Sequence, residues 1–161
     1  MNTMRRVIAI TIATIPMLTA CDRPEPKAPA VVSDDAQPVA SGLPQTAAPK
    51  GASIAFLEPI DGARVSNPVT IRFGATNVAI VPAGDNAPSS GHHHLIVNAA
   101  LPPAGLPIPK NEQYIHFGGG QTQTELTLPP GEHQLTLVLG DHLHIPHVPM
   151  IKSDTITITV D

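Results

Sequence analysis

The stretch HQLTLVLGDHLHIPH, residues 133–147, joins the clearest strand pattern of the chain to its densest group of histidines. Its first seven residues place a leucine at every second position from Leu135, so the three leucines fall on one face. Such an alternation is typical of a β-strand with one side against a hydrophobic core. Gly140 and Asp141 then begin a loop that carries three histidines. We therefore expect a β-strand that leads directly into a histidine-bearing loop.

Other short stretches have the same strand-like character and are separated by turn residues such as Asp61-Gly62. Prolines interrupt every window in which a helical period begins, so no helix is expected in this region. The expected strands cover residues 53–57, 69–73, 92–98, 114–117, 122–128, 133–139 and 155–160. About seven short strands in one domain predict an all-β fold, a small antiparallel immunoglobulin-like β-sandwich.

The N-terminal residues predict export and lipidation. Arg5 and Arg6 precede a short apolar stretch, residues 7–18, which is too short for a transmembrane helix. Leu18-Thr19-Ala20-Cys21 then matches the lipobox of bacterial lipoproteins, and Cys21 is the only cysteine of the chain. We expect residues 1–20 to be a signal peptide. Cys21 would carry acyl chains that anchor the protein in the inner or outer membrane, facing the periplasm of the cell envelope. An ordinary secretory signal with an unrelated cysteine is the alternative.

Residues 21–50 are expected to form the lipidated cysteine and a disordered tether. The segment is rich in Pro, Ala and Ser and has almost no large apolar residue, so it cannot bury enough surface to fold. Residues 51–161 remain as the folded, histidine-rich domain. The chain has a formal net charge of −4 at pH 7, which speaks against nucleic-acid binding and against electrostatic docking on anionic lipid.

All eight histidines lie between His92 and His147. If successive strands run up and down, the connections after the second, fourth and sixth expected strands share one end of the sandwich. Seven histidines would then converge on that end, and His133 would lie at the other. Alternate residues of a strand share a face, so His92 and His94 should pair, with His93 pointing to the core. The same alternation, continued into the loop, would pair His142 with His144.

This convergence predicts a metal site at one end of the sandwich. Imidazoles without thiolates suit Cu(II), Zn(II) or Ni(II), and we expect copper or zinc. A blue-copper site is excluded because it needs a cysteine ligand. The predicted ligands and their close neighbours are His92, His94, His116, His142, His144 and His147. Ligating imidazoles must be neutral, so binding should weaken below about pH 6.

Two other functions stay open. In the first, the histidines form a hydrogen-bonded, pH-sensing network in a non-catalytic structural or interaction domain. In the second, the protein is a metal-dependent enzyme. Only Asp141 and Glu112 are acidic residues near the histidine groups, and the chain has no nucleophile elbow and no His-Glu-x-x-His motif. We therefore predict no catalytic residues, and the sequence names no protein partner or oligomeric state.

Four motifs in the folded part are specific in combination. They are Gly91-His92-His93-His94-Leu95, His116-Phe117-Gly118-Gly119-Gly120-Gln121-Thr122, Leu128-Pro129-Pro130-Gly131 and Gly140-Asp141-His142-x-His144-x-Pro146-His147. On these motifs the chain resembles a bacterial envelope family known as domain of unknown function 4399, from about Ala52 to Val160. The resemblance implies a small exported domain with no assigned reaction. It singles out the same histidines but does not imply an activity.

Overall fold

The computed structural model describes residues 43–161, so the predicted signal peptide, Cys21 and most of the predicted tether lie outside the described residues. Within this range the chain forms nine strands and no helix, and therefore no helix with the length and hydropathy needed to cross a membrane. The strands are β1 (Ser53–Glu58), β2 (Arg64–Val65), β3 (Val69–Thr76), β4 (Ala79–Ile80), β5 (Ser90–Val97), β6 (Tyr114–His116), β7 (Gln123–Leu126), β8 (Gly131–Gly140) and β9 (Ile156–Val160).

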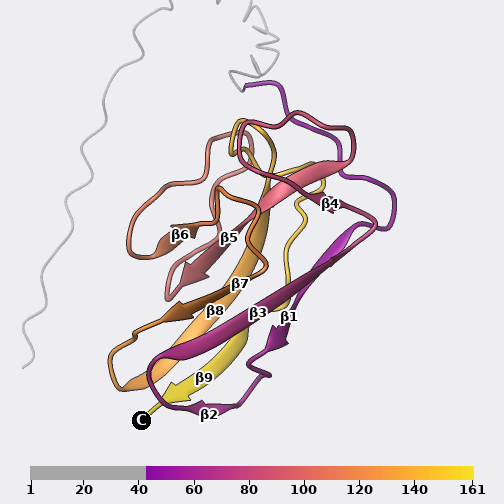
Figure 1. Cartoon of the computed structure of the whole chain (residues 1–161). Helices are drawn as coiled ribbons and strands as arrows, with labels where there is room; N and C mark the ends of the chain where they lie inside the picture. The colour runs from indigo at the N-terminus through magenta and orange to yellow at the C-terminus, as the bar shows by residue number, and fades with distance from the viewer. Residues whose placement is uncertain (1–42) are drawn as a thin grey trace, which may run out of the picture. The chain divides into compact units, whose positions relative to one another are not determined.

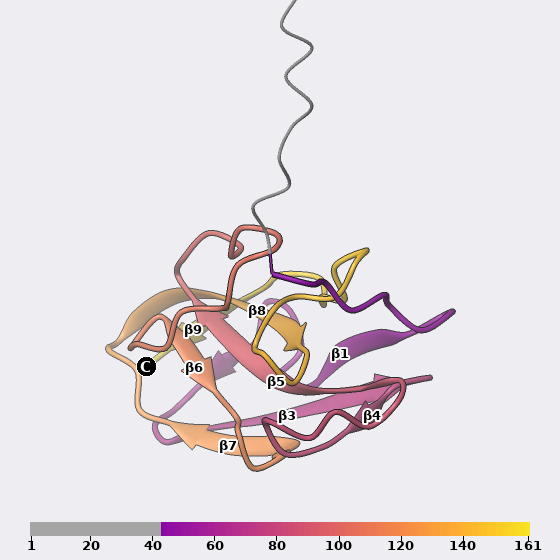
Figure 2. The same ribbon diagram turned by 90° about the horizontal axis from the view of Figure 1, so that it is seen from above.

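The strands form two sheets that pack face to face (Figures 1 and 2). One sheet has the order β1-β3-β7, and the other has the order β2-β9-β8-β5-β4, with β6 also paired to β5. The sheet of β1, β3 and β7 thus lies opposite the sheet that contains β5, β8 and β9, as in immunoglobulin-like domains. The predicted fold class is confirmed. The two strands that the sequence did not predict, β2 and β4, have two residues each, which is too short for an alternation to be recognised.

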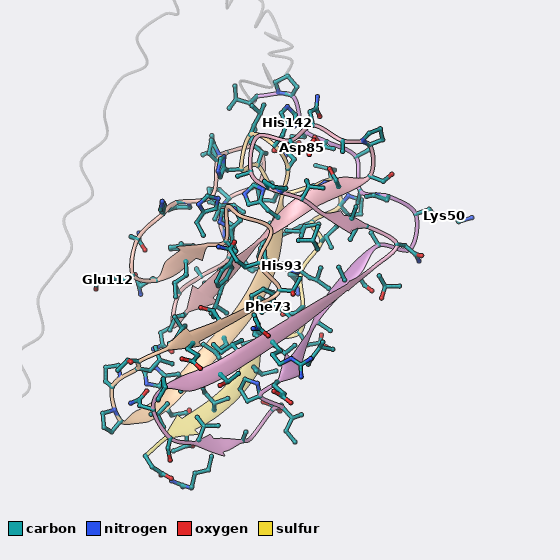
Figure 3. All side chains as sticks on the ribbon, viewed as in Figure 1. Lys50, Phe73, Asp85, His93, Glu112 and His142 are labelled. Carbon is teal, nitrogen blue, oxygen red and sulfur yellow. The ribbon has the colours of Figure 1, made fainter. Side chains whose placement is uncertain are left out.

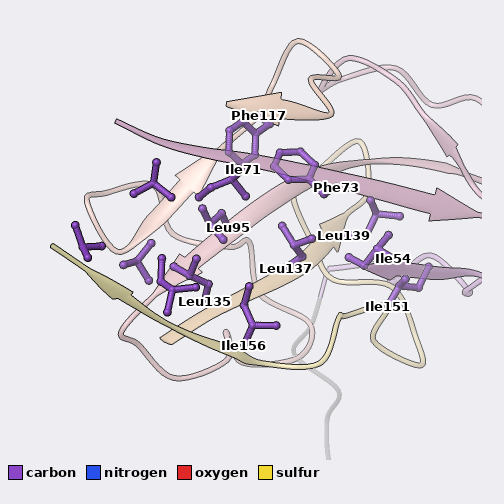
Figure 4. Packing of buried hydrophobic residues seen from close by; sticks show 14 residues of the cluster. Ile54, Ile71, Phe73, Leu95, Phe117, Leu135, Leu137, Leu139, Ile151 and Ile156 are labelled. Atoms are coloured by element: carbon purple, nitrogen blue, oxygen red, sulfur yellow. The ribbon is translucent and has the colours of Figure 1, made fainter. Parts of the chain in front are cut away.

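The core lies between the two sheets (Figure 4). It is built from alternate residues of facing strands, because successive side chains of a strand point to opposite faces. The three leucines of β8 that were predicted to share a face all belong to it. The most deeply buried members are Ile71, Phe73, Leu95, Leu135, Leu137, Leu139 and Ile158. Each such side chain stabilises the fold by about 1.5–3 kcal/mol.

The outer face of the six-stranded sheet is also covered. Ile96 of β5 and Val138 of β8 point away from the main core and pack against Ile108 in a second, smaller cluster. Ile108 comes from the long connection between β5 and β6, and its backbone N–H donates to the carbonyl of His144. As a result, all eight residues of β5 are buried. The histidines of this strand are therefore shielded from water on both faces of the sheet.

Residues 43–50, which the sequence assigns to the tether, contact the loop that follows β8. The N–H of Val148 donates to the Thr46 carbonyl, and the N–H of Ala48 donates to the Val148 carbonyl, both at 2.9 Å. The Thr46 hydroxyl also donates to the carboxylate of Asp141 at 2.7 Å. A truncation at residue 51 would remove all three hydrogen bonds from this loop.

Candidate metal site

Four histidines from three segments bring their rings together on the outer face of the six-stranded sheet. β5 supplies His92 and His94, β6 supplies His116, and the loop after β8 supplies His144. We call these four residues the His cluster. The ring centroids are separated by 4.9 Å (92–94), 5.0 Å (92–116), 4.8 Å (92–144), 5.0 Å (94–116), 4.8 Å (116–144) and 6.0 Å (94–144). Every ring therefore neighbours the other three.

Strand register brings three of these rings together. His92 and His94 are alternate residues of β5 and share its outer face, as predicted. His94 pairs directly with His116 across the antiparallel β5–β6 ladder. Directly opposed residues on one face have Cβ atoms about 5 Å apart, close enough for their rings to meet. Ligand atoms of these three histidines all lie within 4.8 Å of one another, and they form a group able to hold a metal ion.

A tight turn supplies the fourth ring. β8 ends at Gly140, and the N–H of His144 donates to the Asp141 carbonyl at 2.8 Å. His144 has a φ of 66°, in the left-handed region that residues with a side chain seldom adopt. Such a conformation persists only where the surrounding bonds hold it. The turn therefore places the His144 ring, and an extended loop would not.

The same turn corrects the predicted pairing of His142 with His144. The sequence predicts that β8 continues and leaves both side chains on one face. Because the turn begins at Asp141, the alternation ends there, and no ring contact in the described part of the chain includes His142. Figure 3 shows His142 at the end of the molecule, away from His93 in its interior. The site lies on the outer face of the six-stranded sheet, because His92 and His94 alternate with core residues of β5. It also lies where β8 ends, since His92 pairs with Gly140.

Two other histidines are held by protein hydrogen-bonding groups outside the His cluster. The ring of His147 is buried, with Nε2 3.2 Å from the Ser90 carbonyl and Nδ1 3.4 Å from the Leu139 carbonyl. His133 lies at the far end of β8, where its two nitrogens contact the Asn98 side chain at 2.9 Å and the Pro129 carbonyl at 2.8 Å. The two nitrogens of His133 thus face an amide and a carbonyl, whereas both nitrogens of His147 face carbonyl oxygens, and a neutral ring can donate to only one of these.

His93 faces the core, as predicted. Its ring centroid lies 4.7 Å from that of Phe73, between the two sheets (Figure 3). Neither ring nitrogen has a hydrogen-bond partner. Burial lowers the pKa of His93 to about 4. The nearby backbone of Gln121 has a smaller effect that raises the pKa, although it does not form a hydrogen bond with the ring. His93 is therefore a neutral residue of the core and points away from the His cluster.

His92 and His94 are buried, His116 and His144 are half-buried, and the four rings make few hydrogen bonds. Nε2 of His92 and Nε2 of His94 share one hydrogen bond of 3.1 Å, but the Nδ1 atoms of both rings and Nε2 of His116 have no partner among residues 43–161. Burial, and then the neighbouring histidines, lower the pKa of His92 to about 4 and that of His94 to about 2. Burial also lowers the pKa of His116. At pH 7 these rings are neutral, with lone pairs available to a metal ion.

A family model described as Domain of unknown function (DUF4399) matches residues 71–161, more than half of the chain. The chain belongs to this family. The predicted resemblance is confirmed, although the match begins at Ile71 and not near Ala52. All four residues of the His cluster lie inside the matched region. No curated protein and no solved structure matches the chain.

Asp141 holds the loop of this DUF4399 domain that carries His144. One carboxylate oxygen accepts from the Thr46 hydroxyl at 2.7 Å, and the other accepts from the N–H groups of Leu143 at 2.8 Å and Ile145 at 3.0 Å. Burial raises the pKa of Asp141, but these hydrogen bonds outweigh burial and leave the pKa below its usual value. The carboxylate is therefore charged, and it positions the loop.

Two glycines make room for the rings, a role that the sequence did not reveal. A Cβ atom on Gly118 would lie 2.5 Å from Cε1 of His116, and one on Gly140 would lie 3.0 Å from Nε2 of His94. Neither glycine has a positive φ, so the requirement is for space and not for backbone freedom. The closeness of both glycines to a histidine in the sequence was the signal that could have predicted this role.

Proposed function

We propose that this protein is an envelope-anchored lipoprotein whose His cluster binds a transition-metal ion, copper or zinc. One observation carries the proposal: four neighbouring imidazoles include three buried ring nitrogens without a hydrogen-bond partner. A buried polar atom without a partner destabilises a fold by about 1–3 kcal/mol. Coordination to a metal ion would satisfy such atoms, because each neutral imidazole offers one lone pair.

The donor set suits this class of ion. Imidazole is a common ligand of zinc and copper, whereas oxygen ligands are preferred by magnesium and calcium. Metal binding normally displaces protons from its ligands. The lowered pKa values of His92 and His94 mean that both rings are neutral at pH 7, so a metal ion would not have to displace a proton from an imidazolium. The described part of the chain therefore presents these two ligands in the state that a metal ion requires.

The bond between His92 and His94 favours a second function, a purely structural histidine network. Structural networks in protein interiors normally satisfy nearly all of their polar atoms. His133 shows this behaviour in the same domain, since the Asn98 amide and the Pro129 carbonyl face its two nitrogens. The His cluster differs from His133 in its unpartnered nitrogens, so metal binding explains it better.

The anchoring part of the proposal rests on residues 1–42, which lie outside the described range. Its support is the lipobox motif that ends at Cys21 and the Pro-, Ala- and Ser-rich segment that follows. Lipid chains on Cys21 would hold the domain at a membrane on the periplasmic side. A protein partner is not part of the proposal.

Elemental analysis of the full chain, purified in detergent without a histidine tag, tests the metal site. We expect bound copper or zinc in the parent protein and none in the variant His92→Ala/His94→Ala. His133→Ala is the control, because it removes a buried imidazole at the far end of β8 and should keep its metal. His116→Ala, which changes a half-buried ring, should also lose metal and guards against misfolding of the double variant. Equal metal content in the parent and both cluster variants would refute the proposal.

A further inference from the structure

The separations within the His cluster carry information about coordination geometry. In a tetrahedral complex with metal–nitrogen distances of about 2.0 Å, imidazole centroids lie about 3.2 Å from the ion and about 5.2 Å from one another. Five of the six observed centroid separations lie between 4.8 and 5.0 Å, and the sixth is 6.0 Å.

A square-planar arrangement fits these separations less well. Four imidazoles in a plane around one ion have two opposite pairs about 6.4 Å apart and four neighbouring pairs about 4.5 Å apart. If His94 and His144, at 6.0 Å, were one opposite pair, His92 and His116 would have to be the other. Those two rings are only 5.0 Å apart. One long separation, without a second long separation between the other two rings, indicates a distorted tetrahedron.

The surroundings of the His cluster resist a change of geometry. Three of the rings stand on paired strands, so their backbone positions are set by the ladder between β5 and β6. Gly118 packs against the His116 ring, and Gly140 packs against the His94 ring. The fourth ring belongs to a turn that the Asp141 carboxylate holds through two backbone N–H groups. Flattening the cluster would require the sheet or this turn to move.

Given the proposed function, on which this step rests, we infer that the His cluster is a closed tetrahedral site whose resident ion is Zn(II). Zinc has no geometric preference from d electrons and is usually four-coordinate and tetrahedral in structural sites, whereas Cu(II) and Ni(II) favour square-planar or tetragonal surroundings. The ligand atoms of His92, His94 and His116 lie within 4.8 Å of one another, and the neighbouring His144 ring would have to turn a nitrogen toward them to complete the zinc shell. The ion would then join β5, β6 and the loop after β8, and it would stabilise the fold by binding only the folded chain.

The test compares metals on the full chain, purified in detergent without a histidine tag and stripped with a chelator. The probes are Zn(II), Cu(II) and Co(II), whose visible spectrum is intense in tetrahedral sites and weak in octahedral ones. We expect one Zn(II) per chain, an intense Co(II) spectrum and a Zn(II) affinity at least equal to that for Cu(II). A Zn(II) affinity that equals or exceeds the Cu(II) affinity would reverse the usual order of affinities among divalent ions. Zn(II) should also raise the Tm.

Two neighbouring loop variants provide a matched comparison. His144→Ala removes the half-buried fourth ligand without touching the sheet, so Zn(II) affinity should fall at least 100-fold and Cu(II) should then bind more tightly than Zn(II). His142→Ala changes the same loop outside the His cluster and should behave as the parent protein does. Equal effects of the two substitutions would overturn the inference.

The remaining outcomes separate this inference from the proposed function. If Cu(II) displaces Zn(II) from the parent protein at equal concentration, or if the Co(II) spectrum is weak, the tetrahedral zinc site is refuted while metal binding stands. If a cooperatively folded parent protein binds none of the three ions, both the inference and the proposed function fall.

Discussion

Replacing His93 with leucine should make the metal-free domain less sensitive to acid. His93 is fully buried against Phe73, and neither of its ring nitrogens has a hydrogen-bond partner. Burial lowers its pKa from the ordinary value of 6.5 to about 4. Leucine has a similar volume and matches the apolar surroundings, so the substitution removes the titrating group while keeping the core filled.

The sign of the effect follows from proton binding. Between pH 6.5 and about 4, the unfolded chain binds a proton at His93 that the folded chain does not bind. The stability associated with the neutral ring is therefore complete above pH 6.5 and is lost as the pH falls toward 4. At pH 5 the loss amounts to about 2 kcal/mol. Removing a buried polar group without a partner should add about 1–3 kcal/mol of stability at every pH, less the cost of repacking.

Urea unfolding of residues 22–161, treated with chelator, measures this difference at pH 7.5 and pH 5.0. The fall in the free energy of unfolding between the two pH values should be about 2 kcal/mol smaller in His93→Leu than in the parent protein. Leu95→Val, on the same face of β5, is the control. It should lower stability by about 1 kcal/mol equally at both pH values, because it has no ionisable group. An unchanged pH dependence in a cooperatively unfolding His93→Leu protein would refute the reasoning.

Four further outcomes are expected. Gly118→Ala should weaken zinc binding at least tenfold in a titration, because the new Cβ meets the His116 ring at 2.5 Å, whereas Gly119→Ala meets only the Gln121 side chain and should bind normally. Asp141→Ala should lower the free energy of unfolding by about 2–4 kcal/mol in urea, since it leaves three donors without an acceptor, and a loss no larger than that of Asp141→Asn would contradict this role. Zinc binding should persist below the predicted limit of pH 6 and fail near pH 4, because the His92 ring is protonated in that range. A pH titration in which binding is already lost completely at pH 6 would contradict this expectation. Cys21→Ser should move the protein out of the membrane fraction or leave an uncleaved precursor, and mature-sized protein still in the membrane fraction would rule out lipidation.

Local periodicity in the sequence was enough to predict the sandwich and the pairing of His92 with His94. The alternation along residues 133–139 predicts a strand with its leucines in the core, and β8 has them there. The same rule places His92 and His94 together and His93 on the opposite face. These predictions succeed because the side-chain direction in a strand depends only on the parity of the position. Nothing outside the strand is needed.

Tertiary structure alone decided how the site is completed. His116 joins the His cluster because the β5–β6 register pairs it with His94, and a register is set by contacts between strands distant in sequence. His144 joins it, and His142 does not, because the turn that begins at Asp141 ends the alternation of β8 and gives His144 a left-handed conformation. That conformation is held by hydrogen bonds to Asp141. The Asp141 carboxylate in turn accepts a hydrogen bond from Thr46, which lies 95 residues earlier in the sequence. A backbone angle that depends on so distant a residue cannot be predicted from the sequence of the loop.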